Sequence, residues 1–127
     1  MTHGRRALLR LAGGGIAWLV VASDASAHSI LLESVPAAGD TVTPPPHLVL
    51  RFNGRIEKGL STVTLVGPKS TTIQLLRQES APPERLIYRL PGLNPGHYQA
   101  KWKVLSADGH ITEGVLTFNV VTSPAPQ

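Results

Sequence analysis

Cysteine is absent from this chain of 127 residues, and Met1 is its only methionine. The protein therefore has neither disulfides nor thiolate metal ligands, so a metal site in it would have to use nitrogen and oxygen atoms. Aromatic residues make up only 5% of the sequence, which leaves few of them for an exposed binding face. No run of lysine and arginine follows Arg10, and this argues against nucleic acid as a partner.

Residues 1–27 have the three parts of an export signal. Three arginines lie among the first ten residues, residues 11–22 are mainly apolar, and Ala25-Ser26-Ala27 is the small-x-small pattern at which signal peptidase cuts. The apolar stretch is shorter than the ~20 residues that a membrane-spanning helix needs, so we expect cleavage after Ala27 rather than a permanent anchor. The pair Arg5-Arg6 also resembles a twin-arginine signal, and the export route, Sec or twin-arginine, stays open.

Cleavage would leave 100 residues with nine basic and seven acidic side chains, a formal charge of +2. This length is enough for one modest domain, and no linker or internal repeat divides it. We therefore expect one domain over residues 28–121 and a flexible tail over residues 122–127, which contain two prolines and no apolar pattern. The mature protein is expected to be a periplasmic monomer that is not embedded in the membrane.

Apolar and polar residues alternate along most of the mature chain, and no segment has the spacing of an amphipathic helix. The clearest case places Tyr98, Ala100, Trp102 and Val104 on one strand face. The same period predicts strands near residues 29–35, 48–52, 63–65, 73–75, 86–90 and 116–120, separated by turns rich in proline and glycine. About seven short strands at this spacing predict an all-β fold, a β-sandwich.

Cleavage after Ala27 would make His28 the first residue, with two nitrogen donors, its α-amine and its imidazole. An α-amine has an ordinary pKa of only ~7.7–8.0, so a metal ion can displace its proton near neutral pH. Asp108 and His110 flank Gly109, and in an extended stretch this spacing directs both side chains to one face. His28, Asp108 and His110 together offer three nitrogens and one oxygen, a set that suits tetragonal Cu²⁺ better than Zn²⁺.

The mature sequence resembles the CopC family of periplasmic copper-binding proteins along essentially its whole length. The resemblance rests on His28 directly after Ala-x-Ala, on Pro36-Ala37-Ala38-Gly39, on Leu48-Val49-Leu50-Arg51-Phe52, and above all on Leu93-x-Pro95-Gly96-x-Tyr98-x-x-x-Trp102-x-Val104-x-Ser106-x-Asp108-Gly109-His110-x-x-x-Gly114-x-x-x-Phe118-x-Val120. It implies an immunoglobulin-like or cupredoxin-like Greek-key β-sandwich with one Cu²⁺ bound by His28, Asp108 and His110. It also implies a role in copper tolerance or supply, often beside a CopD-type inner-membrane protein.

Two features differ from other members of that family. Some members have a second, methionine-rich site for Cu⁺, but Met1 leaves with the signal, so we expect a protein that binds only Cu²⁺. Several members have Ser-Glu after the strand that ends at Phe52, where this chain has Asn53-Gly54. Whether this loop, Glu33 or Glu113 supplies an outer contact to a ligand imidazole stays open, and surface solvation is the simpler interpretation of both glutamates.

Two other functions also stay open. A copper monooxygenase of the histidine-brace type uses an N-terminal histidine as well, but it needs an open copper position and exposed aromatics, whereas we expect Trp102 and Tyr98 in the core, the latter as a tyrosine corner. A metal-free structural sandwich would leave Asp108-Gly109-His110 as a plain turn. His47 and His97 are interpreted as exposed, non-ligating histidines. We expect a copper-binding protein without enzymatic activity.

Overall fold

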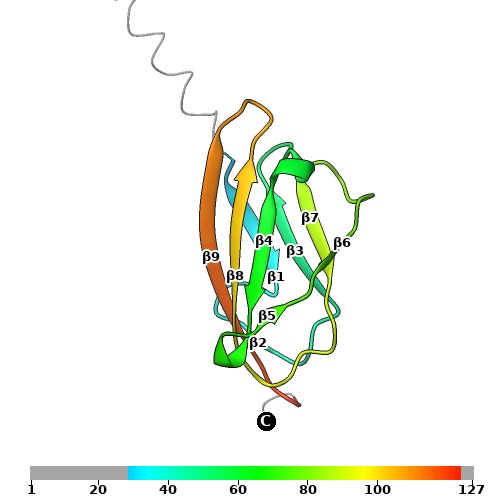
Figure 1. Ribbon diagram of the computed structural model, residues 1–127, viewed down its shortest axis with the longest axis vertical. Coiled ribbons are helices and arrows are strands. Elements are labelled where there is room, and N and C mark those ends of the chain that lie inside the picture. The colour runs from blue at the N-terminus through cyan, green and yellow to red at the C-terminus, as the bar shows by residue number, and fades with distance from the viewer. Residues whose placement is uncertain (1–28, 124–127) are drawn as a thin grey trace, which may run out of the picture.

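The structure is a computed structural model and describes residues 29–123 (Figure 1). Nine strands form two sheets that pack face to face: β1 (Leu31–Val35), β2 (Thr41–Val42), β3 (His47–Phe52), β4 (Thr62–Val66), β5 (Thr72–Ile73), β6 (Leu76–Arg77), β7 (Arg85–Arg89), β8 (Gly96–Leu105) and β9 (Ile111–Val120). Within residues 29–123 the only helical segments are two 3-10 turns, Lys58–Leu60 and Pro68–Ser70, and no helix there is long and apolar enough to cross a membrane. The predicted all-β sandwich is confirmed.

The first sheet has the strand order β1-β3-β7-β6 and the second sheet has the order β2-β9-β8-β4-β5. All neighbouring strands are antiparallel except β2, which pairs in parallel with the end of β9. The longest pairing joins β8 to β9, from Gly96 opposite Val120 to Leu105 opposite Ile111. This hairpin carries the loop 106–110 at its tip, at one end of the sandwich (Figure 1).

The alternation predicted for β8 is confirmed, because Tyr98, Ala100 and Val104 are at most 1% exposed and face the core between the sheets. The phenol of Tyr98 donates a hydrogen bond to the carbonyl of Asn94 at 2.6 Å. Its ring stacks on that of Phe118 from β9, with 5.5 Å between the centroids. The predicted tyrosine corner is therefore present, and it fixes the chain where β8 begins.

Trp102 lies on the same face of β8 but is only half-buried. Its indole meets the ring of Phe52 edge to face, with 5.4 Å between the centroids. It also covers Gly114 on β9, where an added Cβ atom would lie 2.3 Å from the indole Cζ2 atom. Glycine at position 114 lets the indole lie flat on the strand, and the predicted packing role of Trp102 is confirmed.

Two details differ from the expectations. Residues 73–75 do not form one strand, because β5 belongs to the second sheet and β6 to the first, so the chain changes sheets between them. His47 was expected to be exposed, as on an edge strand, but β3 lies between β1 and β7. Its side chain is half-buried, with Nε2 3.4 Å from Nε2 of Gln78. His97 is exposed, as expected.

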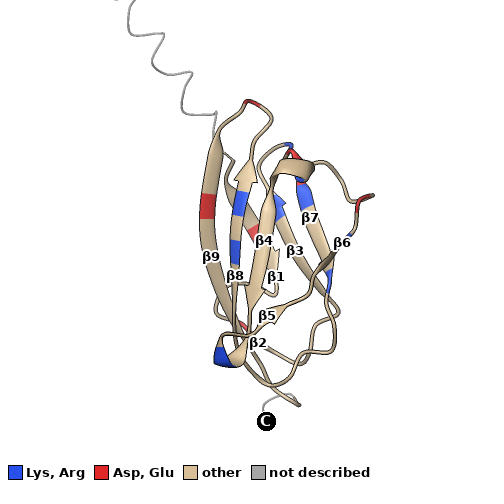
Figure 2. Ribbon diagram, in the orientation of Figure 1, with Lys and Arg blue, Asp and Glu red and all other residues tan. Residues whose placement is uncertain are grey.

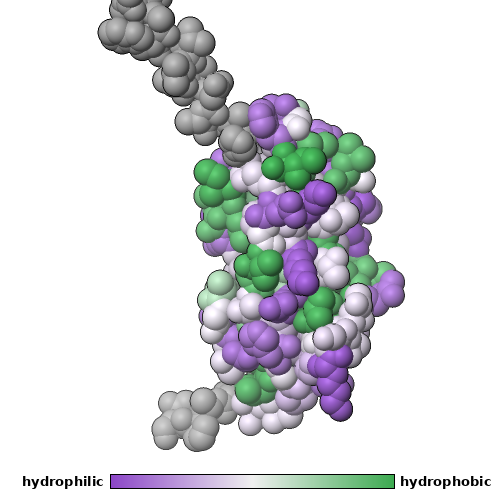
Figure 3. Space-filling view, turned by 60° about the vertical axis from the view of Figure 1, so that its left-hand side comes forward, coloured by the Kyte–Doolittle hydropathy of each residue, from purple (hydrophilic) through white to green (hydrophobic). Residues whose placement is uncertain are grey.

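Several apolar side chains on and beside β1 and β9 remain more than half exposed, among them Ile30, Ile111 and Val115. The space-filling view of this side shows apolar side chains in green separated by hydrophilic ones in purple (Figure 3). Single exposed apolar side chains are common on soluble proteins. This side therefore has no continuous apolar patch that calls for a partner.

Candidate metal site

The loop 106–110 carries two of the three predicted ligands. The amide of Ser106 donates to the carbonyl of His110 at 2.8 Å, and the amide of Gly109 donates to the carbonyl of Ser106 at 3.0 Å. Gly109 has a φ of 93°, a conformation that glycine adopts without strain. The expectation of an extended stretch around Asp108 is wrong, because the chain reverses direction here, but the turn still brings Asp108 and His110 together.

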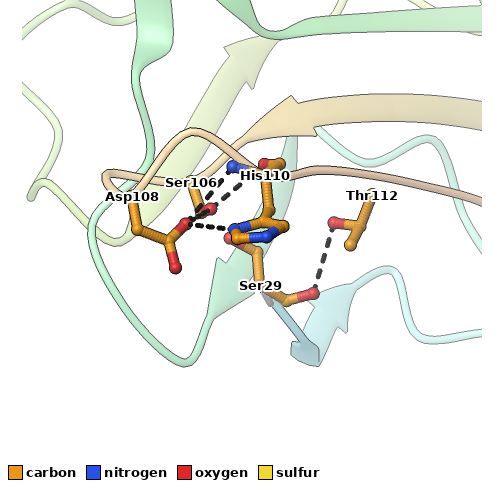
Figure 4. Close-up of polar contacts among 5 residues, drawn as sticks. All are labelled: Ser29, Ser106, Asp108, His110 and Thr112. Carbon is orange, nitrogen blue, oxygen red and sulfur yellow. Dashed lines mark hydrogen bonds and ion pairs between the residues drawn. The ribbon is translucent and has the colours of Figure 1, made fainter. Parts of the chain in front are cut away.

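Asp108 contacts the rest of the loop through one of its carboxylate oxygens, Oδ1 (Figure 4). Oδ1 accepts hydrogen bonds from the Ser106 hydroxyl and, at 3.3 Å, from the backbone amide of His110. The same atom lies 3.2 Å from Nδ1 of the His110 ring. The side chains of His110 and Asp108 are 50% and 43% exposed, so solvent ions can reach both of them.

These hydrogen bonds keep Asp108 ionised. The Ser106 hydroxyl has the largest effect, the ring and amide of His110 add to it, and together they lower the pKa of Asp108 from 3.8 to about 2. A hydrogen bond to the charged form stabilises that form and so lowers the pKa. The carboxylate is therefore charged at any pH at which a neutral imidazole can bind a metal.

The low pKa of Asp108 predicts a small, defined loss of folding stability in acid. Because the folded-state pKa of about 2 lies below the ordinary 3.8, the ionised carboxylate stabilises the fold above pH 3.8, and this contribution disappears as the pH falls through about 2. Ser106→Ala should raise the pKa of Asp108 toward its ordinary value. An NMR titration of the Asp108 carboxyl carbon measures this pKa in the unmodified protein and in the Ser106→Ala variant. A midpoint near 3.8 in the unmodified protein would contradict this account.

Residues 29–30 lie between the two sheets beside this loop. Ser29 is buried, with 6% exposed, and its carbonyl accepts a hydrogen bond at 3.2 Å from the hydroxyl of Thr112, two residues after His110 (Figure 4). Asn53 lies just after β3. Its side-chain Oδ1 accepts a hydrogen bond from the backbone amide of Ile30 at 2.9 Å, and its backbone amide donates one to the carbonyl of Ile30 at 3.0 Å. We call Asn53 and Thr112 the N-terminal clamp, because they attach residues 29–30 to both sheets.

His28, the third predicted ligand, lies outside the described residues, as does the predicted signal over residues 1–27. Within residues 29–123 no group of three His, Cys, Asp or Glu side chains could hold a metal ion. The carboxylate of Glu33 accepts a hydrogen bond from Arg51 at 2.6 Å, and Glu113 is exposed on β9 opposite Lys103. The loop 106–110 thus supplies two candidate ligands, and any further protein ligand has to come from another part of the chain.

Three residues that support the candidate site were not recognised in the sequence. Ser106 has a local signal, since a serine two residues before an aspartate can hydrogen-bond to it within a tight turn. Asn53 and Thr112 have none, because their roles depend on which strands the fold brings next to residues 29–30. The Asn53-Gly54 sequence had raised only the question of an outer metal contact.

Comparison with known proteins identifies related sequences along most of the chain. The CopC domain matches residues 31–121. The chain is 37% identical over 98 residues to protein YobA from Escherichia coli strain K12, which covers 74% of this chain and 79% of that protein. It is 30% identical over 114 residues to copper resistance protein C from Escherichia coli, which covers 79% of this chain and 86% of that protein.

Solved structures show the same fold. CopC from Methylosinus trichosporium OB3b superposes with a TM-score of 0.68 at 35% identity, covering 73% of this chain and 93% of that one. PcoC, a methionine-rich copper resistance protein from Escherichia coli, superposes with a TM-score of 0.68 at 29% identity, covering 75% of this chain and all of that one. The family match, the sequence identities and the shared two-sheet fold lead to one conclusion: this chain belongs to the CopC family.

Proposed function

We propose that this protein, after export to the periplasm and removal of residues 1–27, binds one Cu²⁺ per chain through the α-amine and imidazole of His28 together with Asp108 and His110. Copper is its cargo, held for copper resistance or for delivery to a CopD-type membrane protein. The observation that carries the proposal is the attachment of residues 29–30 next to the loop that holds Asp108 and His110.

The spacing of the two loop ligands suits a single metal ion. Oδ1 of Asp108 and Nδ1 of His110 lie 3.2 Å apart. Two ligand atoms in adjacent positions, each ~2.0–2.2 Å from one ion, are about 3 Å apart. Little movement of either side chain would therefore be needed for both to bind one ion, and the carboxylate is already charged.

The remaining donors would come from the residue before Ser29. One peptide bond joins His28 to Ser29, and Cα atoms across such a bond are about 3.8 Å apart. The carbonyl of Ser29 is hydrogen-bonded to Thr112, two residues after His110. This attachment supports the proposal that a donor one residue before Ser29 could reach the same ion as Asp108 and His110. Chelation by both donors requires a free amine, and this is why the proposal depends on cleavage after Ala27.

The available ligand types favour Cu²⁺ over Cu⁺. Thiolate and thioether sulfur select Cu⁺, whereas imidazole, amine and carboxylate suit Cu²⁺. Cysteine is absent and Met1 lies in the predicted signal, which contrasts with the methionine-rich relative PcoC. We propose a member of the family that binds only Cu²⁺.

A copper monooxygenase is less well supported than a copper carrier. In the described part of the chain four aromatic rings are buried, namely Phe52, Tyr88, Tyr98 and Phe118, and Trp102 packs against the core. A polysaccharide-binding face would need exposed rings. Asp108 would also occupy a copper position that an oxidant needs. Both observations favour a protein that binds copper without transforming a substrate.

Copper titration of the mature protein, followed by electron paramagnetic resonance, tests the proposal. We expect one Cu²⁺ per chain with a tetragonal spectrum and splitting from nitrogen ligands, and weaker binding of Zn²⁺. A protein that binds no Cu²⁺, or whose bound copper shows no nitrogen splitting, would contradict it.

Asn53→Ala should weaken Cu²⁺ binding even though Asn53 is not a proposed ligand. The substitution removes the acceptor of the Ile30 amide at 2.9 Å, so more of the chain before β1 would have to be ordered when copper binds. One hydrogen bond is typically worth about 1 kcal/mol, and about 1.4 kcal/mol corresponds to a factor of ten in affinity, so we expect a loss of up to about tenfold in a competition titration.

Asn119→Ala is the matched control for that measurement. Asn119 makes a side-chain hydrogen bond with His97 at 3.0 Å, at the end of the β8–β9 hairpin that is far from the loop 106–110. Its removal should leave copper affinity unchanged. Equal affinities for the two variants would show that the N-terminal clamp does not assist binding.

A further inference from the structure

The outer face of the first sheet carries two pairs of basic residues in direct cross-strand register. Arg51 on β3 lies opposite Arg85 on β7, and His47 lies opposite Arg89. These side chains point away from the core, because they alternate with the buried residues Leu48, Leu50, Phe52, Leu86 and Tyr88. Figure 2 shows the arginines of β3 and β7 in blue on this sheet. Like charges directly opposite one another destabilise a sheet, so the Arg51–Arg85 pair needs another explanation.

An aliphatic row lies between the two basic pairs. Val35 on β1 lies opposite Val49 on β3, which lies opposite Ile87 on β7. Val35 is 58% exposed and the other two are half-buried. The outer face of the first sheet thus has an aliphatic centre with guanidinium groups on both sides of it, and we call it the arginine face.

Most of the positive charge on the arginine face is not neutralised. Glu33 is the carboxylate in register with these rows, and it pairs with Arg51 at 2.6 Å. Arg89 is exposed and has no side-chain hydrogen bond or ion pair within residues 29–123. Arg85 is half-buried, and its charge helps Arg51 to lower the pKa of Glu33. One carboxylate thus faces three arginines, and Arg89 is the guanidinium group most available to an anion.

We propose that the arginine face docks on an anionic phospholipid membrane, with the guanidinium groups on lipid phosphates and the aliphatic row against the interface. Arginine binds phosphate oxygens with two parallel hydrogen bonds. Arg51 and His47 are four residues apart on one strand, a separation of about 13 Å at ~3.3 Å per residue. A membrane presents phosphates over a whole plane, so it can meet both basic pairs at once, whereas a small anion can meet only one.

The position of the arginine face relative to the metal site agrees with a membrane-facing role. Arg51 is two residues before Asn53 of the N-terminal clamp, so the Arg51–Arg85 pair lies at the metal-site end of the sheet. Docking through this face would hold the proposed copper site close to the membrane. The docking proposal does not depend on copper binding, because it rests on the charges of the sheet alone.

Co-sedimentation of the purified protein with lipid vesicles tests the proposal. Binding should be clearly stronger to vesicles that contain phosphatidylglycerol than to phosphatidylcholine alone, and high salt should abolish the difference. Each arginine near an anionic surface strengthens binding about fivefold, so Arg85→Gln with Arg89→Gln should weaken it roughly 25-fold. Glu33→Gln should strengthen it, the opposite direction from the arginine variant, and a circular dichroism spectrum like that of the unmodified protein shows that the variant is folded.

Lys101→Gln with Lys103→Gln is the matched control, since both lysines are exposed on β8 in the second sheet. This pair should bind vesicles as the unmodified protein does, and every variant carries the same N-terminal segment. Absence of binding to anionic vesicles would overturn the proposal and favour an acidic protein as the partner. Equal losses for the lysine and arginine pairs would overturn it as well, because only net charge would then matter.

Discussion

Replacing Asp108 and His110 together with alanine is expected to weaken Cu²⁺ binding by more than about 1,000-fold. Loss of a single outer contact already costs ~10–100-fold in metal affinity, and this variant removes two proposed ligands. Folding should change little, because both side chains are about half exposed and the backbone hydrogen bonds that close the loop remain. A competition titration against a chelator of known affinity measures the loss.

His97→Ala is the matched control for the double variant. His97 is an exposed histidine on the same hairpin, but it lies at the far end, where it contacts Asn119. Its replacement should leave the affinity for Cu²⁺ unchanged. If the double variant bound copper as tightly as the His97 variant, Asp108 and His110 would form a turn without a metal role.

Adding one glycine before His28 is expected to weaken Cu²⁺ binding by at least about 100-fold, although every side chain is kept. The extension moves the free amine one residue away from the imidazole, so the two can no longer chelate one ion in the same ring. A His28→Ala variant keeps the amine and loses the imidazole, so the two variants separate the donors. Electron paramagnetic resonance should show fewer nitrogen ligands in the His28→Ala variant and a changed spectrum in the extended protein.

The result of the extension distinguishes His28 from a ligand that acts only through its side chain. If the extended protein kept the affinity and spectrum of the mature protein, the α-amine would not bind copper. The proposed donor set would then have to be replaced by one that includes a different nitrogen. Acetylation of the mature N-terminus should have the same effect as the added residue.

The sandwich could be predicted from the sequence where strands are long and have one buried face. In β8 the alternation of Tyr98, Ala100 and Val104 with polar neighbours matches their burial. The pattern could not predict β2, since two residues cannot show a period. For the same reason it could not predict the change of sheet between Ile73 and Leu76, because β5 and β6 also have two residues each. His47 was misjudged because the order of strands in a sheet depends on long-range pairing.

For the candidate site, the sequence predicted the parts that lie close together in the chain. Asp108 and His110 are two residues apart, so any turn or strand there keeps them near each other. The N-terminal clamp could not be predicted, because Asn53 follows β3 of the first sheet whereas Thr112 lies on β9 of the second. The two meet residues 29–30 only after the sheets have packed. The third proposed ligand, His28, was predicted from the signal-peptidase cleavage pattern, which indicates where the chain is cut and not how it folds.

The intact mass of the exported protein, measured under native conditions with and without Cu²⁺, tests the central claim most directly. The account predicts a chain that begins at His28 and gains the mass of one copper ion. A chain that begins at another residue, or one that begins at His28 and gains no copper, would contradict it.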